Sequence, residues 1–258
     1  MTEEDFIGVF DSGVGGISIL KELTSQLPNE DFLFFGDSAN APYGEKTIEQ
    51  VQKLSCDLAG RLIDRGAKAV VIACNTATGA AARMIREAYP SIPVVGVEPA
   101  VKPAAMILPK KKILVMATPM TLQQNKYRSL AARFDAQTTL IPLACPGLAA
   151  RIEEGELDQA DLLEMLEQLL RGYVNQIDGV VLGCTHYPFI KKQIRKILGD
   201  IPMFDGAAGT AKELRRRLEE AKALTDRKEP GRVIFDSSKK DPKELLLYED
   251  FFRAETTV

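Results

Sequence analysis

Short apolar runs alternate with longer amphipathic stretches along most of the chain. Runs rich in β-branched and aromatic residues predict strands at residues 6–10, 31–35, 68–73, 94–97, 112–116, 137–141, 179–182 and 202–204. Apolar residues three or four apart predict helices at residues 47–65 and 162–174. In the first of these helices the spaced residues are Ile48, Val51, Leu54, Leu58 and Leu62. Alternating strands and helices predict an α/β fold with mostly parallel sheets covered by helices.

One local pattern occurs twice. AVVIACNT at residues 69–76 and GVVLGCTH at residues 179–186 each combine a buried strand, a small residue, a cysteine and two hydrogen-bonding residues. Buried strands often look alike, but the pattern also fits two similar lobes that each present one thiol to a shared cleft. The second interpretation predicts a boundary in the proline-containing stretch 92–103 and a C-terminal tail that returns to the first lobe. The predicted lobes are residues 1–98 plus about 208–258, and residues 99–207.

Composition narrows the class of protein. In this chain of 258 residues, 33 Lys and Arg nearly balance 36 Asp and Glu, so a nucleic acid partner is not expected. A share of 45% hydrophobic and 27% charged residues is typical of globular proteins, and no apolar run has the length of a membrane span. The acidic N-terminus is unlike a secretory signal, and four scattered cysteines favour free thiols. We therefore expect a cytoplasmic protein with no membrane association.

The glycine-rich turn GVFDSGVGG at residues 8–16 is the first candidate for chemistry. Its glycines let a ligand approach the backbone, and the N–H groups at the start of the next helix favour an anion. The glycine spacing does not match a dinucleotide-binding fingerprint. The turn places Asp11 and Ser12 at a strand end, where Asp11 either faces a ligand or merely caps the helix.

A second turn, PYG at residues 42–44, also follows a predicted strand. Proline and glycine here need signify nothing beyond a turn. The functional alternative is that Tyr43 closes over a ligand while the Gly44 amide donates to it.

Two of the cysteines, Cys74 and Cys184, end predicted strands just before a helix, where the helix dipole favours a thiolate. His186, the single histidine of the chain, is a candidate to assist the second thiol. By contrast, Cys56 lies within an amphipathic helix, and Cys145 lies in a loop without such polar neighbours. The residues suited to hold carboxylate or amino groups beside the two thiols are Asn75, Thr76, Thr185 and His186.

The spacing of the cysteines argues against several kinds of site. Zinc sites and dithiol redox centres usually contain close cysteine pairs, which this chain lacks, so no metal is expected. A cysteine hydrolase would leave the second strand-end thiol unexplained. Two opposed thiols suit inversion at a carbon made acidic by a carbonyl group: one thiolate removes the α-proton and the other thiol protonates the opposite face.

The combination of motifs resembles the glutamate racemases of the aspartate/glutamate racemase superfamily. The matching segments are FDSGVGG at residues 10–16, PYG at 42–44, ACNTA at 73–77 and GCTHYP at 183–188. The resemblance implies two α/β lobes related by pseudo-twofold symmetry, with the active site between them. It also implies interconversion of L- and D-glutamate without pyridoxal phosphate or metal, a role in supplying D-glutamate for peptidoglycan, and a homodimer.

The resemblance assigns a role to individual residues. Cys74 matches the base that acts on D-glutamate, Cys184 matches the base that acts on L-glutamate, and Asp11 and His186 match residues that assist the two thiols. Glu153 matches a glutamate near the site, with Glu154 beside it as the alternative. The positions that match substrate-binding residues are Asp11, Ser12, Tyr43, Gly44, Asn75, Thr76, Thr118, Thr121, Thr185 and His186.

Some positions depart from the family pattern. Ala117 stands where glycine is common, Gln124 where serine is common, and Asn40 where arginine is frequent. Because the printed chain begins just before the first motif, we expect no activation by a cell-wall precursor of the kind found in members with an N-terminal extension. Two rival functions remain: a racemase for aspartate or another acidic amino acid, and a ligand-binding protein without catalytic activity.

Overall fold

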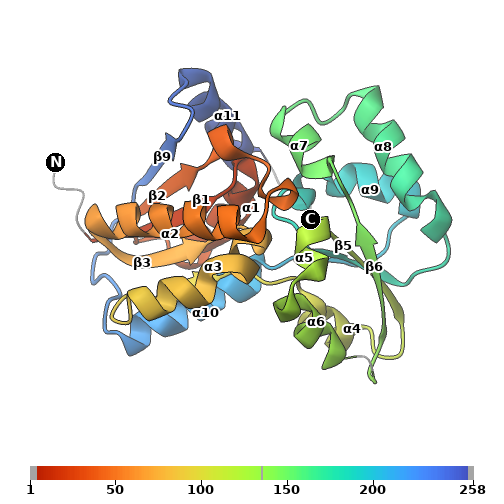
Figure 1. Ribbon diagram of the computed structural model, residues 1–258, viewed down its shortest axis with the longest axis horizontal. Coiled ribbons are helices and arrows are strands. Elements are labelled where there is room, and N and C mark those ends of the chain that lie inside the picture. Colours follow the sequence, from red (N-terminus) through yellow and green to blue (C-terminus); the bar gives the residue numbers. More distant parts are fainter. Residues whose placement is uncertain (1–4, 135, 255–258) are drawn as a thin grey trace.

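Two parallel β-sheets form the centres of two lobes (Figure 1). The computed structural model describes residues 5–134 and 136–254, so the first four residues of the acidic N-terminus lie outside the described residues. The first sheet has the order β4-β3-β1-β2-β9, with β1 at Phe6–Asp11, β2 at Phe32–Gly36, β3 at Ala67–Ile72, β4 at Val94–Gly96 and β9 at Val233–Ser237. The second has the order β6-β5-β7-β8, with β5 at Lys112–Ala117, β6 at Thr139–Ala144, β7 at Gly179–Leu182 and β8 at Met203–Phe204.

The two lobes share one topology. Listed from its other edge, the second sheet has the order β8-β7-β5-β6, which matches β4-β3-β1-β2 strand for strand. Strand β7 is therefore the counterpart of β3, and β5 is the counterpart of β1. The similarity between residues 69–76 and 179–186 thus reflects equivalent positions in two related lobes, and not merely the common composition of buried strands.

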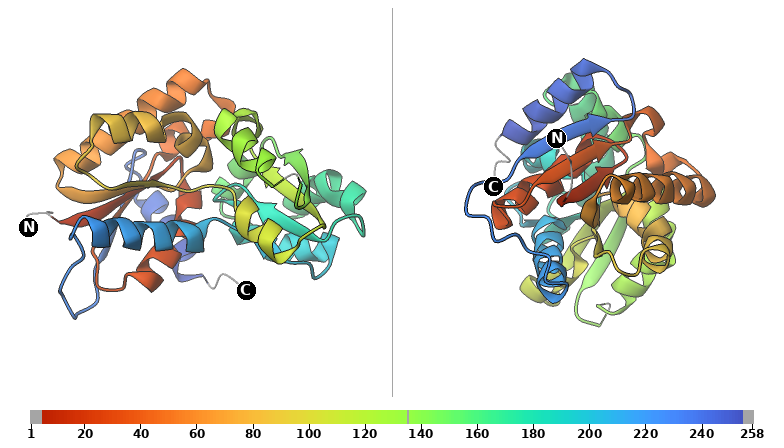
Figure 2. Two further views of the ribbon diagram at one scale, coloured as in Figure 1. Left: turned by 90° about the horizontal axis from the view of Figure 1, so that it is seen from below. Right: turned by 90° about the vertical axis from the view of Figure 1, so that its left-hand side faces the viewer.

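Helices cover both faces of each sheet (Figure 2). In the first lobe α1 (Ile17–Gln26), α10 (Ala207–Glu220) and α11 (Pro242–Arg253) lie on one face, and α2 (Ile48–Asp64) and α3 (Asn75–Ala88) on the other. In the second lobe α4 (Val101–Ile107) and α6 (Asn125–Ala132) cover one face, and α7 (Leu148–Glu153), α8 (Ala160–Leu170) and α9 (Lys191–Leu198) cover the other. The short helix α5 (Pro119–Gln123) contacts α3 of the first lobe.

The alternation of side chains along each strand explains this layering, because successive residues of a strand point to opposite faces. Ile7 and Val9 of β1 pack under α1 and α10, whereas Phe6 and Phe10 pack against α2 and α3. The cluster that contains Ile7 continues into the second lobe, where it includes Leu182 of β7 and the helices α7 to α9. One hydrophobic core therefore joins the two lobes.

The C-terminal part of the chain differs from expectation in its details. Helix α10, which the spacing of apolar residues did not mark, begins at Ala207 and ends at Glu220. Beyond it Arg227 binds Asp31 and the carbonyl of Asn29, which draws the chain to the start of β2. The tail then forms β9, a strand that the apolar pattern did not predict, and β9 pairs with β2.

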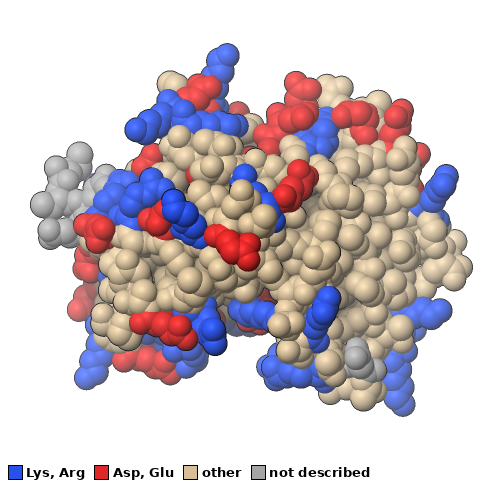
Figure 3. Space-filling view, viewed as in Figure 1, with Lys and Arg blue, Asp and Glu red and all other residues tan. Residues whose placement is uncertain are grey.

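Two other elements are displaced from their predicted ends. The strand expected at 137–141 occupies Thr139–Ala144, and the helix expected at 162–174 starts at Ala160 and changes to a 3₁₀ turn after Leu170. On the face shown in Figure 3, acidic and basic side chains are interspersed over both lobes. Among the described residues, no helix combines the length and apolarity that crossing a membrane requires.

Candidate active site

The two strand-end cysteines line one small cavity between the lobes. Cys74 follows β3 of the first lobe, and Cys184 follows β7 of the second. The cavity has a volume of about 10 Å³, which is room for about one water molecule. Its lining includes the predicted residues Ser12, Tyr43, Gly44, Cys74, Asn75, Thr76, Thr118, Cys184, Thr185 and His186. A cavity of this size is smaller than an amino acid.

Cys74 caps the N-terminus of α3. The Ala77 N–H donates to its sulfur at 3.5 Å, and the thiol lies 3.9 Å from the hydroxyl of Ser12. Burial raises the pKa of the Cys74 thiol well above its usual range, and the nearby charges of Asp11 and Cys184 raise it further. The Ala77 amide opposes this shift only in part. A raised pKa favours the protonated thiol at this position.

A histidine ring lies beside Cys184. Its sulfur lies 3.5 Å from Nδ1 of His186, and Nε2 of the same ring lies 2.5 Å from Oε1 of Glu153. Although burial works against a charged ring, the charge of Cys184 and the hydrogen bonds to Cys184 and Glu153 raise the pKa of His186 above 6.5. An imidazolium between a sulfur and a carboxylate is the expected state of this group.

Glu153 also joins the lobes. The same Oε1 atom accepts a hydrogen bond of 2.8 Å from the backbone N–H of Val14, in the glycine-rich turn. A Cβ atom on Gly13 would overlap the carboxylate of Glu153, so glycine is needed for this approach. We expected the turn to admit a ligand anion, but it receives a carboxylate of the protein itself. Glu154 is mostly exposed and pairs with Arg151, so Glu153 is the glutamate at the site.

Asp11 does not cap the helix that follows it. No side-chain cap is formed at the start of either the 3₁₀ turn at Val14–Gly16 or α1. Its carboxylate instead accepts from the Ser12 hydroxyl at 3.0 Å and, across the cleft, from the Thr185 hydroxyl at 2.7 Å. Burial raises the pKa of Asp11, although the charge of His186 and the Thr185 hydrogen bond lower it in part.

Three threonine hydroxyls from both lobes meet beside the cavity, which Thr76 and Thr118 line. The hydroxyl of Thr76 lies 3.0 Å from that of Thr118 and 3.2 Å from that of Thr121, and the last two are 2.9 Å apart. Beside them, Nδ2 of Asn75 is buried and has no hydrogen-bond partner among the described residues. Such a group is an available donor for a ligand carboxylate.

Sequence reasoning missed the part played by Asp37 and Gln124. The Tyr43 hydroxyl donates to Asp37 at 2.6 Å, and Nδ2 of Asn40 donates to the same carboxylate at 3.0 Å. Gln124, seen only as a departure from the family pattern, donates to the carbonyl of Thr76 at 3.0 Å. Asp37 could have been found, because it follows the end of a buried strand as closely as Asp11 does.

The two other cysteines differ in burial. Cys56 is partly exposed and packs beside the α2–α3 core, as expected. Cys145 is buried, and burial together with the charge of Cys184 raises its pKa to about 12. Within the described part of the chain no group of three or more His, Cys, Asp or Glu side chains could hold a metal ion.

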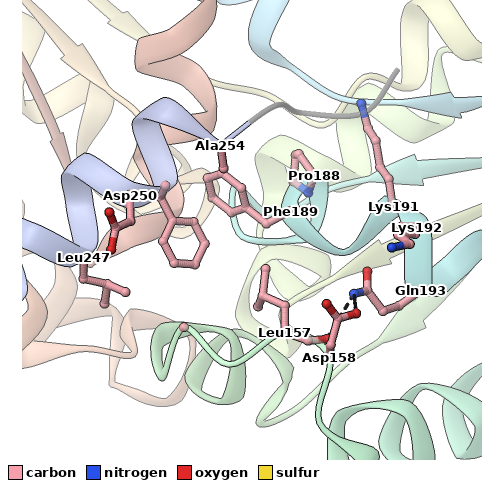
Figure 4. Close-up of a pocket in the computed structure, with 12 residues that line it drawn as sticks. Leu157, Asp158, Pro188, Phe189, Lys191, Lys192, Gln193, Leu247, Asp250 and Ala254 are labelled. Carbon is pink, nitrogen blue, oxygen red and sulfur yellow. Dashed lines mark hydrogen bonds between the residues drawn. The ribbon is translucent and has the colours of Figure 1, made fainter.

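A larger cavity of about 330 Å³ lies elsewhere, between the α7–α8 loop, the start of α9 and the C-terminal helix α11 (Figure 4). Leu157, Phe189 and Leu247 supply apolar walls, and Lys191 and Asp250 lie at its edge. None of the residues that line the thiol cavity lines this one.

Comparison with known proteins agrees with this geometry. The family model for Asp/Glu/hydantoin racemases matches residues 7–214. A glutamate racemase of Clostridium acetobutylicum is 45% identical over 242 residues, which cover 93% of this chain and 94% of that protein. The crystal structure of a Francisella tularensis glutamate racemase in complex with D-glutamate aligns with a TM-score of 0.83 at 33% identity, over 100% of this chain and 96% of the other. A Bacillus anthracis glutamate racemase isoform aligns with a TM-score of 0.86, also at 33% identity, over 99% and 96%.

The chain belongs to the Asp/Glu/hydantoin racemase family. It is an isomerase of the racemase class, with the two-lobed fold of its structural neighbours.

Proposed function

We propose that this racemase interconverts L- and D-glutamate with two thiols and no cofactor. The relatives named glutamate racemase, and the D-glutamate in the Francisella tularensis neighbour, support the choice of substrate. The observation that carries the mechanism is that Cys74 and Cys184 stand at equivalent strand ends of opposite lobes and line the same cavity.

Cys184 is the base for L-glutamate. The imidazolium of His186, 3.5 Å from the sulfur, stabilises the thiolate, and Glu153 holds the ring in that orientation. The thiolate takes the α-proton: the carbon–hydrogen bond breaks, an S–H bond forms, and the electron pair spreads into the adjacent carboxylate. Donors already in position lower the cost of that developing charge.

Cys74 then delivers a proton to the opposite face. Its raised pKa keeps the sulfur protonated before the reaction, as a proton donor must be. After transfer the S–H bond of Cys74 is broken and the new carbon–hydrogen bond has the D configuration. With D-glutamate the roles reverse. Asp11 assists Cys74 through Ser12, whose hydroxyl donates to the Asp11 carboxylate at 3.0 Å and lies 3.9 Å from the Cys74 sulfur.

Hydrogen-bond donors around the thiols bind the substrate. The free Nδ2 of Asn75 and the three threonine hydroxyls at 76, 118 and 121 suit carboxylate groups, because the substrate can replace the contacts that these hydroxyls make with one another. Ser12, Thr185, Tyr43 and the Gly44 amide complete the proposed set on the remaining walls.

We also propose how the molecule works as a whole. Residues 1–98 with about 208–258 form one moving lobe and residues 99–207 the other, and their separation opens the closed cavity. The enzyme acts as a homodimer in the cytoplasm, where it supplies D-glutamate for peptidoglycan. Light scattering of the purified protein tests the dimer, and D-glutamate dependence of a deletion strain tests the cellular role.

The decisive experiment incubates the reduced protein with L-glutamate in deuterated water without added cofactor. Proton NMR follows loss of the α-proton and circular dichroism follows loss of optical activity, with L-aspartate in parallel. Exchange together with racemisation of glutamate alone is the expected result. Reaction of aspartate alone would move the assignment to the rival racemase.

Single-thiol variants test the mechanism itself. Cys184→Ala and Cys74→Ala should each abolish racemisation, because neither remaining thiol can reach both faces of the α-carbon. Cys56→Ala is the matched control and should keep wild-type activity. Full activity of Cys184→Ala would disprove the two-thiol mechanism.

A further inference from the structure

The loop that carries Tyr43 is anchored by the C-terminal part of the chain. It begins at Gly36, where β2 lies between β1 and β9. The Ser238 N–H donates to the carbonyl of Gly36 at 3.1 Å, and the Ser238 hydroxyl accepts from the N–H of Ala39 at 3.0 Å. Residues about 200 positions apart in sequence therefore fix the first turn of this loop.

Tyr248 of α11 makes the deepest of these contacts. Its side chain is fully buried, and its ring packs edge-on against Phe34 at 5.4 Å between centroids. The hydroxyl lies 2.7 Å from the Ser38 hydroxyl and 3.1 Å from Oε1 of Glu244. A Cβ atom on Gly36 would overlap the Tyr248 hydroxyl, so β2 ends in a glycine where the tyrosine enters.

Further hydrogen bonds link the neighbourhood of Ser38 to the thiol cavity. The next residue back, Asp37, donates its N–H to the carbonyl of Asp11 at 2.9 Å and accepts the Tyr43 hydroxyl at 2.6 Å. Tyr43 lines the thiol cavity beside Cys74. A Cβ on Gly44 would stand 2.9 Å from Cβ of Thr118, so the loop also reaches the second lobe. A shift at Ser38 therefore moves groups on the Cys74 side of the cavity.

We propose that Tyr248 is a positioning residue for racemisation, acting through Ser38 and Asp37 on Tyr43 and so on the proton transfer made by Cys74. The inference rests on the proposed function. The C-terminal helix then belongs to the apparatus that orders one half of the site, although it contributes no group to the cavity.

The test replaces Tyr248 with phenylalanine, which keeps the ring packed on Phe34 and removes only the hydroxyl. We expect kcat/KM for glutamate to fall about three- to tenfold in both directions, the loss typical of one buried hydrogen bond. Tyr173→Phe is the matched control, because that tyrosine is partly buried in the second lobe, away from the loop that carries Tyr43; it should behave as the wild type.

Isotope effects distinguish positioning from general damage. If only the Cys74 transfer is slowed, the kinetic isotope effect should rise with D-glutamate deuterated at the α-carbon and fall with the deuterated L-isomer, since Cys74 takes the α-proton of the D-isomer alone. Ser38→Ala should cause the same change while leaving Glu244 bound to Tyr248. The double variant should be no slower than the slower single variant, because Tyr248 and Ser38 act through the same hydrogen bond.

The outcomes separate the two proposals. A wild-type protein that does not racemise glutamate would overturn the proposed function and this inference together. If the wild type racemises glutamate but Tyr248→Phe and Ser38→Ala both show unchanged isotope effects, the inference alone is overturned. This holds whether or not the melting temperatures of the two variants fall. Ser38→Ala provides the result if the Tyr248 variant does not fold.

Discussion

Replacing Glu153 with glutamine removes one charge from the contact between the lobes and leaves its shape intact. In the wild type a single oxygen of Glu153 accepts from the Val14 N–H and from Nε2 of His186. The amide oxygen of glutamine can accept from the same two donors. The substitution therefore changes the electrostatics of the contact and not its packing.

The size of the effect follows from the two hydrogen bonds. A bond to a charged group contributes about 1.5–3 kcal/mol and a neutral one about 0.5–1.5 kcal/mol, so the Val14 bond loses about 1 kcal/mol. The His186 bond keeps its charged donor and loses up to about the same amount with its ion pair. The Glu153 side chain is 13% exposed, so solvent screens its charge only slightly. The total loss of stabilisation is therefore about 1–2 kcal/mol. We expect the free energy of unfolding to fall by that amount and racemisation of L-glutamate to slow by about 5- to 30-fold.

The effect has a definite pH dependence. Because the folded pKa of His186 is raised above 6.5, the stabilisation from its ion pair with Glu153 is complete below that pH and is lost as the pH rises through the folded pKa. The difference in stability between wild type and Glu153→Gln should therefore be largest near pH 6 and shrink in alkaline solution. The ion-pair contribution should be lost there, whereas the hydrogen bonds to Glu153 from Val14 and from the neutral ring can remain.

The assay uses the fact that His186 is the only histidine of the chain. Its ring protons give one set of NMR signals, so a titration reports its pKa directly in wild type and variant. Glu153→Gln should lower that pKa. Glu154→Gln is the matched control, because Glu154 lies in solvent with an ion pair to Arg151 at 3.6 Å, and it should leave both titration and rate unchanged. An unchanged His186 titration in Glu153→Gln would refute this account of the contact.

Three further substitutions test other parts of the structure. Hydrogen bonds from Arg227 lower the pKa of Asp31, so Asp31→Asn should melt at a lower temperature than wild type at pH 7, and thermal scans should show this gap narrowing as the pH falls below about 4. In Gly79→Ala the new methyl group overlaps the Gln124 amide and breaks its hydrogen bond, which should cost about 1 kcal/mol in urea unfolding; in the background of Gln124→Ser, which already lacks that bond, Gly79→Ala should cost less. Asn75→Ala should raise KM for glutamate about tenfold without lowering the melting temperature, because its Nδ2 has no partner to lose among residues 5–134 and 136–254; a destabilised variant with unchanged KM would contradict this assignment.

The fold could be largely predicted because each strand carries its own signal. The continuous, buried apolar runs of β1 and β7 can be recognised without knowledge of their neighbours. The tail strand β9 was not recognised, because only part of it is buried and it is ordered by pairing with β2. Likewise the path of the chain after α10 depends on Arg227, which binds Asp31, a residue far away in sequence.

The site could be predicted only as a set of residues. Strand-end positions identified Asp11, Cys74 and Cys184 as candidates because the ends of parallel strands meet at one edge of a sheet. The sequence alone could not decide between Glu153 and Glu154, because the two are neighbouring residues of the same type. It depends on which side of α7 faces the glycine-rich turn.

The sequence by itself determined the two-lobed α/β architecture and the pairing of two thiols, because periodicity and the ends of strands are local properties of the chain. Only the tertiary structure decided how the two halves of the site differ. His186 and Glu153 favour charge beside Cys184, whereas burial favours a protonated thiol at Cys74. The physical reason is that a pKa depends on the solvent exclusion and the charges around a group, and these come from residues that folding brings together across the two lobes.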